Sequence, residues 1–232
     1  MSIIASYVTD DFLVIATDTR VLHKESPDPD FAGDNAGKLY QTEIGWGSGS
    51  GFYELINNFF LNLTQCSIKS SEDVRLCYNH TYLHACMEYP KSIDAINGTK
   101  VVFSYLTRED NKSFLRIGML GKDFFDKNTG VLSYESLFVL WPDDVKESIV
   151  EVLNSKYYKL AQGKREINEI VFIISRLFKE VSSISRTVSG ICDFGVTVLM
   201  DGSLTSFNIR DSAGNIEQAC LSGTLDRYIK LY

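Results

Sequence analysis

The chain has 232 residues, of which 44% are hydrophobic and 23% charged, as expected for a single globular domain spanning residues 1–232. Its net charge of -7 and pI near 5.0 argue against a nucleic-acid partner, which usually requires a basic face. No stretch reaches the roughly 18 apolar residues of a membrane span, and the first residues lack the basic region of a signal peptide. Five cysteines in no tight framework indicate free thiols and therefore a cytoplasmic protein.

The first twenty residues predict a β-hairpin that begins at the start of the chain. Residues 3–8 and 12–17 are apolar runs rich in β-branched side chains, and Thr9-Asp10-Asp11 between them is a turn signal. Such a hairpin places the terminus inside a sheet, where most termini fray. Removal of Met1 would leave Ser2 with a hydroxyl and a free α-amine, which is a nucleophile that carries its own base.

Candidates for a supporting cation and anion follow in the sequence. Asp18 ends the second predicted strand, and Lys38 opens the apolar stretch 38–42. Taken singly, Asp18 is more often a turn former and Lys38 a solvated charge, so the signal lies in their combination with Ser2. Residues 45–51 (Gly-Trp-Gly-Ser-Gly-Ser-Gly) predict a glycine-rich turn, in which backbone N–H groups can approach a substrate oxyanion.

The rest of the chain groups strands apart from helices. Apolar periodicity predicts helices over 52–63, 71–89, 142–157 and 167–181, the second of them capped by Ser71. A second hairpin is expected from strands over 38–42 and 44–47, which meet across Glu43, and further strands over 100–106, 114–119, 132–141, 192–200 and 203–209. Residues 22–37 are expected to form an exposed polar loop. Strands grouped in this way favour antiparallel sheets, and therefore an α+β fold.

One helix carries a possible metal-binding pattern. Cys77, His80 and His84 share one face of the predicted second helix and could bind zinc. A fourth ligand is not evident, because Cys86 lies off that face. We therefore favour a packing face for this helix and expect neither a metal nor a cofactor.

The N-terminal pattern resembles the catalytic β-subunits of the proteasome and their bacterial relatives, the N-terminal-nucleophile (Ntn) hydrolases. The resemblance rests on the segment Ala16-Thr17-Asp18-Thr19-Arg20, a lysine that opens a strand, a glycine-rich turn and the later pair Ser189-Gly190. It implies a four-layer αββα sandwich of two antiparallel sheets. By the same resemblance the catalytic residues are Ser2, Asp18, Lys38, Gly49 and Ser189.

The resemblance also implies an activity and an assembly. Ser2 Oγ would attack a peptide or other amide, with Lys38 and Asp18 supporting the attack, the Gly49 N–H receiving the oxyanion and Ser189 bonding the α-amine. A homo-oligomeric ring is implied as well, and the identity of any ATPase partner stays open.

The sequence also departs from the family pattern. Arg186 replaces an acidic residue of the family, and the family's Gly-Ser-Gly-Ser segment is absent from the middle of the chain. Two alternatives therefore remain: a non-catalytic structural subunit, and a small-molecule amidase or acylase on the same fold.

Overall fold

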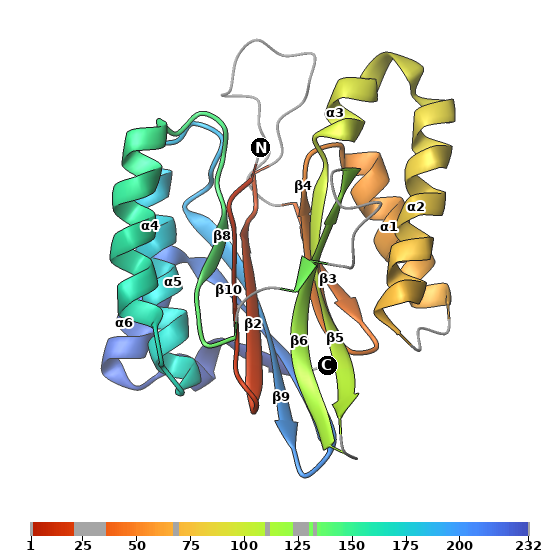
Figure 1. Cartoon of the computed structure of the whole chain (residues 1–232). Helices are drawn as coiled ribbons and strands as arrows, with labels where there is room; N and C mark the ends of the chain where they lie inside the picture. Colours follow the sequence, from red (N-terminus) through yellow and green to blue (C-terminus); the bar gives the residue numbers. More distant parts are fainter. Residues whose placement is uncertain are drawn as a thin grey trace.

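The structure is a computed structural model that describes residues 2–20, 36–66, 70–109, 112–122, 130–131 and 134–231, with the backbone alone at 130–131 and 231. Two sheets lie face to face between two layers of helices (Figure 1). Every strand pair in the described chain is antiparallel. The predicted αββα sandwich of two antiparallel sheets is therefore confirmed.

The first sheet contains the first and last described strands, and the second contains most of the strands between them. The order in the first sheet is β11 (Ile229–Leu231), β10 (Ser203–Ser212), β9 (Ile191–Met200), β2 (Phe12–Asp18), β1 (Ile4–Val8) and β8 (Phe138–Leu140). The order in the second sheet is β3 (Leu39–Thr42), β4 (Gly45–Ser50), β5 (Lys100–Glu109), β6 (Lys112–Gly121) and β7 (Gly130–Val131).

Each sheet has its own helical layer (Figure 1). The first sheet is covered by α4 (Glu147–Ala161), α5 (Ile167–Ser182) and α6 (Ala213–Ser222), and the second by α1 (Tyr53–Gln65), α2 (Ser71–Glu88) and α3 (Ile93–Asn97). Short 3-10 turns span Pro90–Ser92 and Leu225–Tyr228.

The predicted N-terminal hairpin forms β1 and β2 in the interior of the first sheet. The two strands pair from Ile4 opposite Thr17 to Val8 opposite Leu13, and every residue of both is buried. Alternate side chains such as Ile3 pack beneath the helices, while Ile4 faces the second sheet. Because both faces are covered, the strands read as continuous apolar runs rather than alternating ones.

The second predicted hairpin forms as β3 and β4, but the glycine-rich stretch 45–51 is not a turn, because the buried strand β4 continues through residue 50. Its glycines at 47 and 49 face α1, where a Cβ would lie 2.2 Å from Phe60 and 2.8 Å from Ile56. On the opposite face, Trp46 enters the space that a Cβ at Gly195 would fill. These glycines therefore serve close packing between layers.

Other predicted elements differ in their limits. Only Phe138–Leu140 of the strand predicted over 132–141 pairs with β1, and residues 132–133 lie outside the described chain. The cap of α2 is Ser70 rather than Ser71, because Ser70 and Asp73 bond each other's backbone N–H groups. Helix α6 was not predicted. The loop expected over 22–37 lies outside the described residues up to residue 35.

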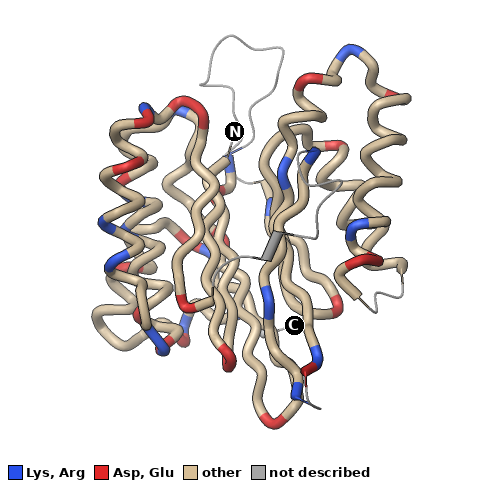
Figure 2. Tube along the Cα trace, in the orientation of Figure 1, with Lys and Arg blue, Asp and Glu red and all other residues tan. Residues whose placement is uncertain are grey.

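Charged residues of both signs are interspersed along the outer helices in the view of Figure 2. Among the described helices, none is both long enough and apolar enough to cross a bilayer.

Candidate active site

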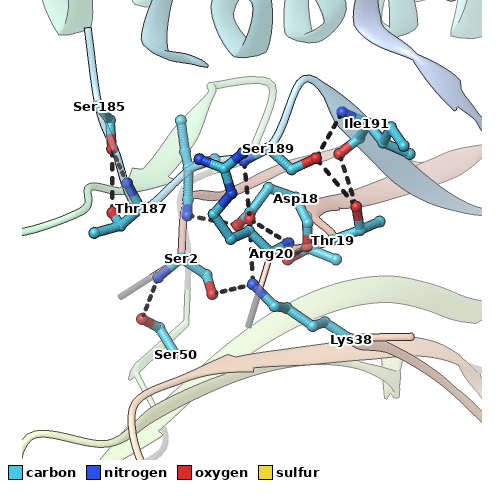
Figure 3. A network of polar contacts seen from close by, with 12 residues as sticks. Ser2, Asp18, Thr19, Arg20, Lys38, Ser50, Ser185, Thr187, Ser189 and Ile191 are labelled. Carbon is cyan, nitrogen blue, oxygen red and sulfur yellow. Dashed lines mark hydrogen bonds and ion pairs between the residues drawn. The ribbon is translucent and has the colours of Figure 1, made fainter. Parts of the chain in front are cut away.

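Ser2 lies two residues before the start of β1, at the end of the sandwich where the N-terminus is seen between the two sheets (Figure 1). Ser2 is 8% exposed, so this position is almost inaccessible to solvent. Asp18 ends the neighbouring strand β2, and Lys38 precedes β3 on the opposite sheet. The fold thus brings together three predicted site residues that are far apart in sequence (Figure 3).

The Lys38 ammonium joins the other two side chains. Its Nζ donates to Ser2 Oγ at 2.7 Å and to Asp18 Oδ2 at 3.2 Å. The Lys38 side chain is 9% exposed and that of Asp18 is fully buried. A buried ion pair persists only when further hydrogen bonds compensate its lost hydration.

Backbone donors supply that compensation at Asp18. Its Oδ1 accepts from Ile3 N at 3.2 Å, and its Oδ2 accepts from Arg20 N at 2.9 Å and Ser189 N at 3.4 Å. The carboxylate therefore ties β1 and the segment before β9 to the end of β2. It also keeps Lys38 directed at the Ser2 hydroxyl.

The structure places Ser189 beside Asp18. The Ser189 hydroxyl accepts from Ile191 N at 2.9 Å and from Thr19 Oγ1 at 3.3 Å. Ser2 N, the atom that becomes the α-amine when Met1 is removed, donates instead to Ser50 Oγ at 3.2 Å. Sequence reasoning missed Ser50 because it treated residues 45–51 as a turn.

A carboxylate from another segment supports the loop before Ser189. Asp144 accepts from Arg186 N and Ser185 Oγ, each at 2.8 Å, and from Thr187 Oγ1 at 2.9 Å. Burial raises the pKa of Asp144, but hydrogen bonds from Ser185, Thr187 and the backbone outweigh it, so the pKa lies below its ordinary value.

The same loop also contacts the end of β2. The Arg186 carbonyl accepts from the Arg20 guanidinium at 2.7 Å. An acidic group thus reaches this loop from Asp144, although position 186 itself is basic. Asp144 lies 41 residues before Ser185, and no local sequence signal marks it.

Gly49 lies in β4, one residue before Ser50, and pairs with Val101 of β5. Ile56 excludes a Cβ at this position. Packing alone therefore requires glycine at position 49, and its role as an oxyanion donor stays a prediction.

A cysteine paired with Asp18 is held in its neutral form. Cys192 pairs with Asp18 across β9 and β2 and is fully buried. Burial raises its pKa well above the ordinary value, and the carboxylates of Asp193, Asp211 and Asp18 raise it further. The Cys192 thiol is therefore a poor nucleophile.

The possible zinc ligands do not form a cluster in the structure. Cys77 is half-buried against the α1–α2 packing, whereas His80 and His84 are exposed and His84 contacts Glu88 at 3.3 Å. Within the described chain, no three His, Cys, Asp or Glu side chains lie close enough to hold a metal ion.

The chain has a proteasome-like α+β fold. Two antiparallel sheets face each other between layers of helices, and the N-terminal strand lies in the interior of the first sheet. No family model and no curated protein sequence matches the chain.

Solved structures of Anbu proteins share this fold. Anbu, described as an ancestral beta-subunit, from Yersinia bercovieri superposes with a TM-score of 0.66 at 11% identity, over 98% of this chain and 96% of that one. An Anbu Gly-1 mutant from Hyphomicrobium sp. strain MC1 gives 0.64 at 14% identity over 98% and 96%. Another Anbu structure from that strain gives 0.62 at 12% over 97% and 95%. At such low identity the similarity shows the fold and does not transfer a catalytic residue.

Proposed function

We propose that this protein is an Ntn hydrolase that cleaves amide bonds with Ser2 after Met1 has been removed. The observation that carries the proposal is the position of the Lys38 ammonium, 2.7 Å from Ser2 Oγ and 3.2 Å from Asp18 Oδ2 in a buried site. A hydroxyl that contacts a cation, which in turn contacts a carboxylate, is an arrangement that activates the hydroxyl as a nucleophile.

The chemistry follows from these positions. The α-amine, with an ordinary pKa of about 7.7–8.0, takes the Ser2 hydroxyl proton as Oγ bonds to the substrate carbonyl carbon. The Lys38 charge favours the neutral form of the amine, and it stabilises Ser2 Oγ as negative charge develops on that atom. The proton then moves to the leaving nitrogen as the C–N bond breaks. Water attacks the resulting ester, which releases the acid and restores the Ser2 hydroxyl.

The oxyanion is assigned to the backbone N–H of Gly49. This assignment rests on the family resemblance together with the position of Gly49 beside Ser50, whose hydroxyl contacts Ser2 N. Preorganised N–H donors of this kind are worth about 3–4 kcal/mol in the transition state.

We further propose peptides as substrates, a homo-oligomeric ring as the assembly and the cytoplasm as the location. The free thiols of all five cysteines support a reducing compartment. The ring rests on the fold similarity alone. It would restrict access to an otherwise unselective hydrolase.

A structural, non-catalytic subunit is the second candidate. The observation that favours it is the arrangement around Ser189, whose hydroxyl bonds Thr19 and Ile191, together with the basic residue at position 186. Under this alternative, the Asp18–Lys38 pair serves to fix strand ends.

The test is the intact mass of untagged protein expressed without an N-terminal extension, before and after treatment with a β-lactone. Loss of Met1 and a single adduct are expected. The adduct should be lost in Ser2→Ala and kept in Ser48→Ala, which removes a buried hydroxyl without a hydrogen-bond partner in the described part of the chain. Full retention of Met1, or an adduct that persists in Ser2→Ala, refutes the proposal.

A panel of unstructured peptides set beside small amides then distinguishes a peptidase from an amidase. Cleavage of many peptides is expected. Turnover confined to small amides would assign the protein to the small-molecule class.

A further inference from the structure

The Ser2 nitrogen has a hydrogen-bond partner on the opposite sheet. Ser50 ends β4 in the second sheet, whereas Ser2 precedes β1 in the first. Ser2 N donates to Ser50 Oγ at 3.2 Å, and both residues are buried (Figure 3). The hydroxyl and the nitrogen of Ser2 therefore contact different groups, Lys38 for the hydroxyl and Ser50 for the nitrogen.

The local chain holds Ser50 firmly. Ser50 pairs with Lys100 of β5, and the next residue, Gly51, has φ +128°, a conformation that side chains rarely adopt. A Cβ at Gly51 would lie 2.5 Å from Thr99 Oγ1, and that oxygen accepts from Phe52 N at 2.8 Å. The turn out of β4 is thus closely packed, so the Ser50 hydroxyl is presented in a defined position.

Ser48 provides an internal contrast. It lies two residues earlier on the same strand and the same face, and it is fully buried. Among the residues that the structure describes, its hydroxyl has no hydrogen-bond partner. Burial of a serine on this face of β4 does not by itself create a contact, so the Ser50 contact is specific to the position facing Ser2.

We propose that Ser50 is a positioning residue that orients the terminal nitrogen of Ser2 for proton transfer. This inference rests on the proposed function, because the nitrogen becomes an amine only after Met1 is removed. Anchoring one N–H to Ser50 Oγ restricts rotation about the N–Cα bond. The lone pair is then kept in a fixed relation to the Ser2 hydroxyl, which is the geometry that proton transfer requires.

The contact also affects when the nitrogen carries its proton. An acceptor hydroxyl favours the protonated amine, whereas the nearby Lys38 ammonium disfavours it. Asp18 and Arg20 are the other charged residues of this network, with Asp18 bonded to Lys38 and Arg20 bonded through its backbone to Asp18. Removing the Ser50 hydroxyl should therefore let the amine lose its proton at lower pH.

The experiment compares Ser50→Ala, Ser50→Thr and Ser48→Ala in protein from which Met1 has been removed. Ser50→Ala should lower kcat about tenfold to a hundredfold with little change in KM. It should also shift the rising limb of the pH–kcat profile down by roughly one pH unit. Ser50→Thr keeps the hydroxyl and should retain the wild-type midpoint, and Ser48→Ala should match the wild type in both respects.

A second readout does not depend on catalysis. The Ser2 ¹³Cα chemical shift, followed against pH in protein labelled at serine, reports the protonation of the terminal amine directly. Ser50→Ala should lower this midpoint, and Ser50→Cys, whose thiol is a weak acceptor, should do the same if Ser50→Ala fails to fold.

The outcomes separate the two proposals. If the wild type is active and Ser50→Ala has the same kcat and the same midpoint pH for titration of the terminal amine, the role of Ser50 is overturned and the proposed hydrolase stands. A wild type that cleaves nothing, but whose amine midpoint still moves in Ser50→Ala, overturns the hydrolase and retains the contact. A Ser50→Thr midpoint equal to that of Ser50→Ala also overturns the role of Ser50.

Discussion

The buried pair of Asp18 and Lys38 should respond unequally to loss of its two members. Lys38→Met leaves the carboxylate with three backbone donors, from Ile3, Arg20 and Ser189. Asp18→Asn removes the charge that those donors and Lys38 share, and it turns one acceptor oxygen into a donor. The carboxylate is therefore the structural centre of the pair, and the lysine is its more dispensable partner.

The magnitudes follow from the hydrogen bonds that each substitution removes. Lys38→Met removes two hydrogen bonds, one to Asp18 at 3.2 Å and one to Ser2 Oγ at 2.7 Å. The first joins two charged groups and is worth about 1.5–3 kcal/mol, and the loss of the second is offset because the buried ammonium no longer has to be desolvated. Asp18→Asn breaks a buried pair and sets an amide N–H against other donors, which costs about 3–5 kcal/mol. Both side chains are almost inaccessible, with 9% and 0% exposure, so solvent screening reduces neither value much.

Urea denaturation of the wild type, both variants and the double variant measures these free energies of unfolding. The rate of β-lactone labelling, measured in parallel, should fall at least about a hundredfold in Lys38→Met despite its milder loss of stability. A Lys38→Met variant less stable than Asp18→Asn would refute the central structural role of the carboxylate. Labelling at the wild-type rate in Lys38→Met would refute the catalytic role of the lysine.

Three further predictions concern residues outside this pair. Asp144→Asn should cost about 0.5–1 kcal/mol at pH 7, because this exposed carboxylate is screened. Since its folded pKa is lowered, the difference from wild type should disappear as pH falls through that pKa in urea titrations. Gly195→Ala places a Cβ 2.2 Å from Trp46 Cγ and should cost about 3 kcal/mol in thermal denaturation. A thiol reagent should react with exposed Cys66 in the native protein. Burial raises the pKa of Cys192, so this thiol should react only after unfolding.

Each of these predictions has a matched control or a contradicting result. Gly214→Ala lies in α6, where no heavy atom of the described residues comes within 4 Å of the new Cβ. This substitution should be neutral or stabilise by up to about 1 kcal/mol. An Asp144→Asn difference that grows in acid would contradict the lowered pKa of Asp144. Labelling of Cys192 as fast as Cys66 would show that the core around β9 opens readily.

The N-terminal half of the site could be predicted because its signals are local. Two continuous apolar runs separated by a turn define the hairpin, and Asp18 follows at the end of the second run. Lys38 directly precedes the next described strand, β3. The structure brings Ser2, Asp18 and Lys38 into contact as the pattern suggested.

The parts that were missed depend on packing between distant segments. A glycine in a strand and a glycine in a turn look alike in sequence, and only the approach of Phe60 and Ile56 distinguishes them. Ser50 was missed with that misassignment, and Asp144 has no signal near the loop it supports. Helix α6 does carry local sequence signals, because Ser212 caps its start and a glycine, Gly223, follows its end.

The candidate site depends on how the two sheets are placed against each other. Ser2, Asp18 and Ser189 come from the first sheet or its flanking segments, whereas Lys38 and Ser50 come from the second. Both partners of Ser2, one on its hydroxyl and one on its nitrogen, therefore reach it across the interface between the sheets.

Away from the site, Trp46 of β4 fixes this interface. Its side chain packs against Gly195 of β9, and its indole N–H donates to the Val196 carbonyl at 3.1 Å. A shift of one sheet along the other would change the Lys38–Ser2 distance and the Ser50–Ser2 distance together. Because proton transfer is sensitive to displacements of about 1 Å, substitutions at this contact should reduce the reactivity of Ser2 more than their effect on stability would suggest.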